Sequence, residues 1–88
     1  MTLRIETAFD GQTATLRLIG RIESEYLEEL QAQVRRHCPR LVLDLHEVTL
    51  VDVSVVRFLI ACEAEGIRLL NCTPYIREWI RREREPGQ

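Results

Sequence analysis

The chain contains no lysine, because all twelve of its basic residues are arginine. This excludes lysine chemistry such as a Schiff base or a P-loop lysine. The net charge is only −2, and acidic and basic residues are mixed along the chain, so no basic field attracts the phosphates of nucleic acid. Every apolar run is too short to span a membrane. We therefore expect neither a nucleic-acid ligand nor membrane insertion.

Cysteine and histidine are also scarce. Cys38, Cys62 and Cys72 are an odd number without paired spacing, which does not indicate a disulfide framework. His37 and His46 lack zinc-ligand spacing with any cysteine. No Ser–His–Asp order or catalytic pair of carboxylates emerges, so we expect no metal, no cofactor and no enzyme activity. The first residues show no signal-peptide pattern, which predicts a cytoplasmic protein.

The composition is that of a small globular protein. The 88 residues allow a single domain over residues 1–88, and 45% of them are hydrophobic and 30% charged. A chain of this length is marginally stable alone and needs an efficient core or a partner. The segment Arg81–Gln88 is charged and then contains Pro and Gly, so we expect it to fray.

Hydrophobic periodicity and turn signals predict the elements. Leu3–Phe9 and Thr13–Ile19 have the pattern of strands, and the turn at Asp10-Gly11 joins them into an antiparallel hairpin that Gly20 ends. The later strands are the short apolar runs Leu41–Leu45 and Ile67–Leu70. The predicted helices are Glu23–Arg36 (capped by Ser24 and stopped by Pro39), Val53–Ala64 (ended by Gly66) and a last helix that Thr73 caps, with Pro74 at its first position.

The resulting order, β-β-α-β-α-β-α, predicts an α/β fold: a small mixed sheet of four strands with three helices packed against it. Leu41–Leu45 and Ile67–Leu70 flank a helix, so they should be parallel neighbours, with Leu41–Leu45 central in the sheet. The expected core includes Leu43, Leu59, Leu69 and Trp79.

The most informative segment is the start of the helix near Val53. Asp52 precedes this helix, where an Asp is most often an N-cap. Ser54 lies in the first turn, either as a tolerated polar residue or as a phosphoacceptor that the helix dipole favours and Asp52 opposes. The residues alone leave both interpretations open.

The same helix is apolar over roughly two-thirds of its circumference, at about 100° per residue, and covering one face of a sheet requires less than that. Either the helix is wedged between the sheet and another helix, or Val53 and Val55 form part of an exposed apolar patch for a partner. Arg57 and Glu65 mark its narrow polar side.

Three segments, in their order and spacing, resemble those of one known family. Ile19-Gly20-Arg21-Ile22-Glu23 is similar to a Gly-x-Leu/Ile-Asp/Glu turn into a first helix. Leu43-Asp44-Leu45 followed by Val48-Thr49-Leu50-Val51-Asp52 resembles a strand and the approach to a switch loop, and Leu70-Asn71-Cys72-Thr73-Pro74-Tyr75-Ile76 resembles the segment after a fourth strand. The family is the STAS family (sulfate transporter and anti-sigma factor antagonist domains), and the resemblance covers about Leu3 to Ile80.

The resemblance implies a role for the Asp52 segment. In anti-sigma factor antagonists of this family, an Asp-Ser-Ser/Thr-Gly motif begins the second helix. An anti-sigma kinase phosphorylates the residue just after the Asp, and only the unphosphorylated form binds that kinase. Here Asp52 matches the acid, Val53 occupies the acceptor position, Ser54 matches the second hydroxyl and Val55 replaces the Gly. The usual phosphoswitch is therefore expected to be lost, with Ser54 as the remaining candidate acceptor.

We interpret the sequence as a bacterial, non-enzymatic interaction module of transcription regulation that binds an anti-sigma kinase-like protein. The alternatives are a STAS-type adaptor subunit of an ATPase-driven transport complex or other multiprotein complex, and a structural module that associates with itself as a homodimer. A small-molecule binder or an enzyme is a further class, and it would need a cleft with convergent polar groups. The expected partner-binding residues are Gly20, Arg21, Glu23, Asp52, Val53, Ser54, Val55 and Arg57.

Overall fold

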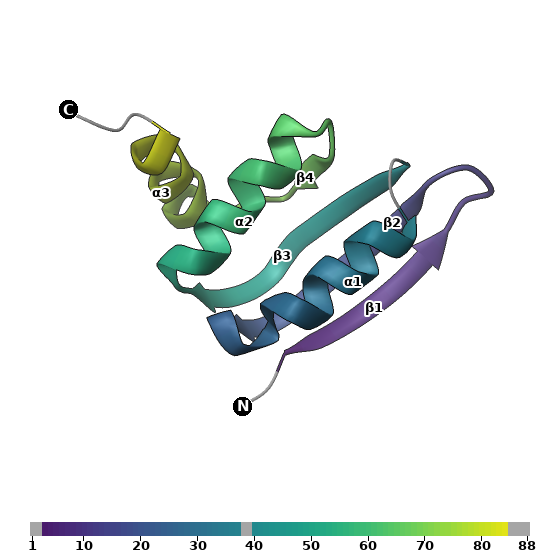
Figure 1. Cartoon of the computed structure of the whole chain (residues 1–88), viewed down its shortest axis with the longest axis horizontal. Coiled ribbons are helices and arrows are strands. Elements are labelled where there is room, and N and C mark those ends of the chain that lie inside the picture. The colour runs from purple at the N-terminus through teal and green to yellow at the C-terminus, as the bar shows by residue number, and fades with distance from the viewer. Residues whose placement is uncertain (1–2, 38–39, 85–88) are drawn as a thin grey trace.

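Four strands form one mixed sheet in the order β1-β2-β3-β4. The computed structural model in Figure 1 describes residues 3–37 and 40–84. The first two strands pair antiparallel, and the pairs β2–β3 and β3–β4 are parallel. The predicted α/β fold, the hairpin and the parallel pair are confirmed. The strands are β1 (Arg4–Phe9), β2 (Ala14–Ile22), β3 (Leu41–Val51) and β4 (Arg68–Leu70).

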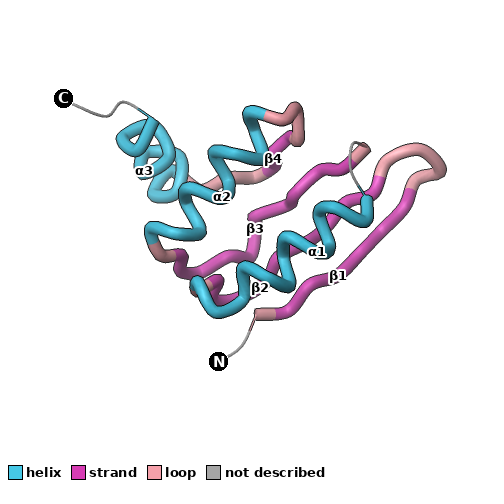
Figure 2. Tube along the Cα trace, in the orientation of Figure 1, coloured by secondary structure: helices cyan, strands magenta, loops and turns pink. Residues whose placement is uncertain are grey.

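The helices α1 and α2 lie together on one side of the sheet, and α3 packs against α2 (Figures 1 and 2). A single 3₁₀ turn, η1, precedes α1. This arrangement buries alternate residues of the strands: Leu16 and Leu18 on β2 are fully buried, whereas Arg17 between them is exposed. The elements are η1 (Ser24–Tyr26), α1 (Leu27–His37), α2 (Val53–Ala64) and α3 (Pro74–Arg84).

The core contains Leu43 and Leu59 as predicted, at 0% and 1% exposure. Leu69 and Trp79 were also expected there, but both are only partly buried against it. The reason is their position. Leu69 lies on β4, an edge strand with a neighbour on one side only. Trp79 lies near Tyr75 along α3, with their ring centroids 5.8 Å apart and Tyr75 exposed.

Strand β2 does not end at Gly20 as predicted but continues to Ile22. Gly20 has a φ of 98°, a backbone conformation that glycine adopts without the cost that a side chain imposes. It pairs with Val48 and lies beside a shift in the register of β2 with β3. The glycine thus permits an irregularity within the strand instead of terminating it.

Strand β3 is longer than the predicted Leu41–Leu45, because it runs on to Val51. Its partners are spaced unevenly: Arg17 pairs with Asp44, but Ile19 pairs with Glu47. The extra residue on β3 places two consecutive exposed residues at positions 46 and 47. This interrupts the alternation that signals a strand, so the sequence pattern missed the second half.

The predicted helix Glu23–Arg36 begins differently from expectation. Ser24 is the first residue of η1 and not an N-cap; the cap position is Glu23, whose side chain makes no capping hydrogen bond. Regular helix begins at Leu27. The predicted stop at Pro39 and the predicted extension of the apolar stripe to Cys38 lie outside the described residues.

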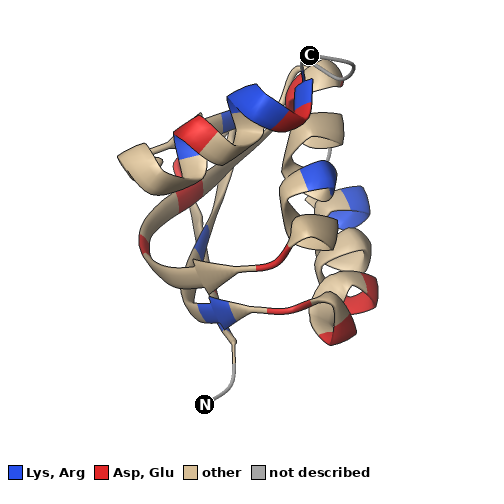
Figure 3. Ribbon diagram, turned by 90° about the vertical axis from the view of Figure 1, so that its left-hand side faces the viewer, with Lys and Arg blue, Asp and Glu red and all other residues tan. Residues whose placement is uncertain are grey.

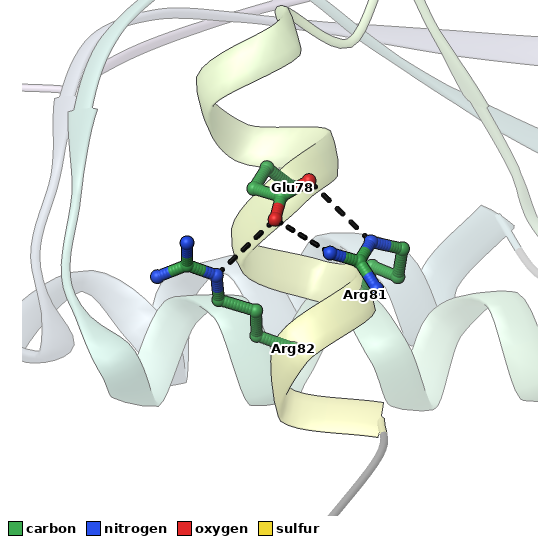
Figure 4. Close-up of polar contacts among 3 residues, drawn as sticks. All are labelled: Glu78, Arg81 and Arg82. Carbon is green, nitrogen blue, oxygen red and sulfur yellow. Dashed lines mark hydrogen bonds and ion pairs between the residues drawn. The ribbon is translucent and has the colours of Figure 1, made fainter.

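Helix α3 begins as predicted, with the Ile76 N–H donating to Thr73 Oγ1 at 3.4 Å. The segment from Arg81 onward was expected to fray; residues 81–84 are helical, and residues 85–88 lie outside the described part of the chain. Glu78 accepts hydrogen bonds from Arg81 (2.6 Å) and Arg82 (3.2 Å), as Figure 4 shows. These bonds hold the pKa of the Glu78 carboxyl below its usual value. Such i,i+3 and i,i+4 pairs support the last turns of the helix.

Candidate functional site

Asp52 caps helix α2. Its backbone is extended, with φ −113° and ψ 178°, and its Oδ1 accepts a hydrogen bond from the Val55 N–H at 3.0 Å. The backbone carbonyl of Asp52 also accepts from the Val56 N–H at 3.0 Å, the first bond of the helix ladder. The predicted N-cap is confirmed, and it satisfies a donor that the helix itself leaves unpaired.

The second oxygen of the same carboxylate binds another part of the chain. Asp52 Oδ2 accepts a hydrogen bond from the Ser24 N–H at 2.8 Å. Ser24 opens the 3₁₀ turn after β2, whereas Asp52 follows β3, so one carboxylate joins the two strand-to-helix connections. The strands run parallel and pair at Arg21 with Leu50 and at Ile22 with Val51, which places both connections at the same end of the sheet.

The two groups of residues predicted for partner binding therefore meet at one corner. An open hollow of about 280 Å³ lies there, lined by residues of both connections. Beside it, Leu50 is 41% exposed and Val53 is 39% exposed. We call Leu50 and Val53, with Glu23, Ser24 and Glu25 around them, the corner patch. The residues lining the hollow are Glu23, Ser24, Glu25, Leu50, Val51 and Asp52.

The other residues predicted for the site differ in their burial and contacts. Val55 was expected on the partner surface, but its side chain is fully buried in the core, so only its backbone contributes to the corner, through the bond to Asp52. Ser54 is half-buried. Arg57 is exposed and lies 3.6 Å from the Glu83 carboxylate of α3 (Nε to Oε1), so its guanidinium connects the two helices.

Both interpretations of the wide apolar arc of α2, packing in the core and an exposed apolar patch, hold in part. Val55, Val56, Leu59 and Cys62 are buried, which accounts for the side that packs on the sheet and its neighbours. Val53 at the first helical position remains exposed. Val55 has the right-handed backbone of a helix, so a side chain at this position creates no backbone strain.

Acidic residues are frequent in the two segments that form the corner patch. The segments 20–29 and 50–53 carry the acids Glu23, Glu25, Glu28, Glu29 and Asp52, against Arg21 as their one base. Arg21 lies 3.7 Å from Glu23 (Nη2 to Oε2), and both side chains are nearly half exposed, so this ion pair is weak. Figure 3 shows red acidic segments on the two strand-to-helix connections and at the adjoining start of a helix.

The corner combines carboxylates, a serine hydroxyl and exposed apolar side chains. Val53 has no hydroxyl, and both oxygens of Asp52 are occupied by backbone N–H groups. Within residues 3–37 and 40–84, no group of three or more His, Cys, Asp or Glu side chains is arranged to hold a metal ion. In the same part of the chain, no helix has the length and hydropathy needed to cross a membrane.

A second polar cluster lies on the face of the sheet away from α1 and α2. Asp44 accepts hydrogen bonds from the His46 N–H (3.0 Å) and the Asn71 side-chain amide (3.1 Å). Partial burial acts to raise the pKa of the Asp44 carboxyl, but these two bonds and the charge of Arg17 outweigh it and hold the pKa below its usual value. Asn71 has a φ of 56°, and its bond to Asp44 fixes the turn after β4.

Sequence reasoning missed three residues of the corner: Ser24, Glu25 and Leu50. Leu50 was placed in a loop because the strand signal ended at Leu45. Ser24 was expected to cap its own helix, whereas its contact at the corner is the hydrogen bond that its backbone N–H donates to Asp52. The only signal for this bond is the parallel pairing of β2 with β3, which brings residues 28 positions apart into contact.

Two comparisons find known proteins to which this chain is similar. The family described as "Mlab, STAS domain" matches residues 5–81. The solved structure of "the Anti-Sigma Factor Antagonist SpoIIAA in its Unphosphorylated Form" is similar, with a TM-score of 0.62 and 20% sequence identity, over 91% of this chain and 82% of that chain. At this identity the likeness concerns the fold. No curated protein matches the chain.

Proposed function

This chain belongs to the STAS domain family, and we propose that it is a non-enzymatic module that binds an anti-sigma kinase-like protein through the corner patch without a phosphoswitch. The observation that carries the proposal is Val53. It is the first residue of α2 and it is exposed, and by the sequence resemblance it matches the position at which antagonists of the family carry the phosphorylated residue.

The geometry supports constitutive binding. A phosphate at the first position of α2 would place a charge in the middle of the contact surface, and removing that possibility leaves an apolar surface at all times. Val53 and Leu50 together present exposed apolar side chains that a partner can cover. The hydrogen bonds of Asp52 hold the two connections together, so the surface is formed before binding.

A second candidate function follows from the same residue. A STAS-type adaptor subunit of an ATPase-driven complex needs a permanent docking surface and no switch. Val53, which lacks a hydroxyl, suits this role as well as it suits an antagonist. Both candidates use the same surface, so the identity of the partner distinguishes them.

The test compares Val53→Asp with Val53→Thr. An aspartate at the first helical position is compatible with the helix dipole, so the fold should survive while a buried charge opposes the interface. Threonine has nearly the shape of valine and should retain binding. Binding is measured by titration calorimetry against the purified anti-sigma kinase-like and ATPase proteins of the same genome.

We expect Val53→Asp to melt cooperatively and to bind at least about tenfold more weakly, a difference of about 1.4 kcal/mol. Val53→Thr should bind within about threefold of the natural chain. If Val53→Asp binds as tightly as the natural chain, the contact surface lies elsewhere. The class of protein that binds the natural chain decides between antagonist and adaptor.

A further inference from the structure

The corner patch has a distinct combination of surface chemistry. Leu50 and Val53 provide an apolar centre, and Glu23 and Glu25 line the hollow next to Leu50. Exposed apolar residues rimmed by charges are typical of protein contact surfaces. The sign of the charge on the rim therefore indicates which charge the partner carries.

Among the described residues, Glu23 of the rim has an ion-pair partner, Arg21 at 3.7 Å, and this exposed pair is weak. Asp52 is engaged by two backbone N–H groups, but Glu25, which lines the hollow, is exposed. An anion such as a phosphate group would meet these carboxylates on approach, although the start of a helix otherwise favours anions. The corner therefore disfavours an anionic ligand and favours a cationic one.

The α3 helix of a second copy is a poor match for this rim, whereas Arg35, Arg36, Arg40 and Arg68 are exposed and make a second copy an outcome that the experiment tests. The arginines of α3 are held by glutamates of the same chain: Arg77 and Arg84 both contact Glu63 at 3.3 Å, and Arg82 contacts Glu78 at 3.2 Å. Moving them to another molecule would break these pairs. A different protein that presents unpaired basic residues gains more from the contact than α3 of a second copy does.

We propose that the corner patch docks a protein surface with an apolar centre and a rim of arginine or lysine, which the acidic rim attracts and orients. The proposal rests on the proposed function and specifies the chemistry of its partner. Complementary rims accelerate association and exclude acidic proteins that offer only a matching apolar patch. The binding should therefore depend on ionic strength.

The experiment first obtains the partner through the site itself. A photo-crosslinking amino acid is placed at Leu50, and in a control at Phe9, which is exposed at the far end of β1. The protein that crosslinks in cells from Leu50 and not from Phe9 is identified by mass spectrometry and purified. Its Kd for the natural chain is then measured by calorimetry at low and high NaCl concentration.

Two charge reversals complete the test. Glu25→Arg changes the rim, and Glu65→Arg makes the same change of net charge at the opposite, C-terminal end of α2, where the side chain is also exposed. We expect Kd to rise about tenfold between about 50 mM and about 500 mM NaCl. We expect Glu25→Arg to weaken binding about tenfold and Glu65→Arg to leave it within about twofold.

The outcomes separate this inference from the proposed function. A partner captured from Leu50 whose Kd is insensitive to salt and to Glu25→Arg overturns the basic rim and leaves the binding function standing. Equal loss in both charge reversals shows an effect of net charge and also overturns it. If crosslinks form only between copies of this chain, the corner patch binds a second copy and the proposal of a different partner is overturned. No crosslink specific to Leu50 refutes both proposals.

Discussion

Replacing Asp52 tests whether one carboxylate holds the two connections of the corner together. Its Oδ1 caps α2 through Val55, and its Oδ2 binds the Ser24 N–H. Loss of an N-cap costs about 1 kcal/mol, and loss of the second hydrogen bond costs about 0.5–1.5 kcal/mol. We therefore expect Asp52→Ala to lower the free energy of unfolding by about 2 kcal/mol, or roughly 8–16 °C in Tm for a chain of this size.

Asp52→Asn separates the two bonds. Asparagine caps helices about as well as aspartate, but its amide offers one oxygen in place of two, and its NH₂ group cannot accept from Ser24. The variant should keep the cap and lose the bond between the connections, at a cost of about 0.5–1.5 kcal/mol.

Ser24→Pro removes the donor of that bond from the other side. Ser24 is the first residue of its 3₁₀ turn, a position where proline is accepted. Glu23 before it is extended, with φ −114° and ψ 163°, as the residue before a proline must be. The ring also displaces Asp52 Oδ2, so the bond is lost completely. Ser24→Ala keeps the N–H and serves as the control.

The measurement is urea unfolding followed by circular dichroism, for the single variants and for the double variant Asp52→Asn with Ser24→Pro. If the bond exists, Asp52→Asn should cost almost nothing further once Ser24 is proline, a coupling of roughly 1 kcal/mol. Additive costs, or an Asp52→Asn variant as stable as the natural chain, would refute the role assigned to Asp52. Ser24→Ala should change the stability by less than about 0.5 kcal/mol.

Three further predictions concern the core, the switch and the polar cluster. Leu59→Ala should cost about 2–5 kcal/mol in urea unfolding, whereas the exposed Val53→Ala should cost no more than about 0.5 kcal/mol; equal costs would show that α2 is docked differently. Incubation with the genome's anti-sigma kinases and ATP should leave Ser54 unmodified in mass spectrometry, and stoichiometric phosphate there would restore a working switch. An NMR titration of Asp44 should give a midpoint below the usual value of 3.8, and Asn71→Ala should raise it. The stability that Asp44 contributes is therefore present above the unfolded-state pKa and is lost as pH falls through the lower folded-state pKa; a midpoint at or above 3.8 would contradict this.

Most element positions follow from short-range patterns that the sequence displays directly. Asp52 caps α2 and Thr73 caps α3 as predicted, because capping depends on a side chain and an N–H three residues apart. The period of two in β2 identifies its buried face. The parallel pairing of Leu43 with Leu69 follows from the helix between them, since such crossovers join parallel strands.

The corner patch depends on contacts that no local pattern encodes. Whether Val53 or Val55 faces outward is decided by the direction in which α2 packs on the sheet, because its apolar arc is wide enough to permit either. The exposure of Leu50 follows from the irregular register of β3 with β2. The bond from Ser24 to Asp52 exists only because parallel pairing brings their two connections to the same end of the sheet. Local periodicity and capping therefore determined the kind and order of the elements, whereas strand register and helix packing decided which residues form the surface.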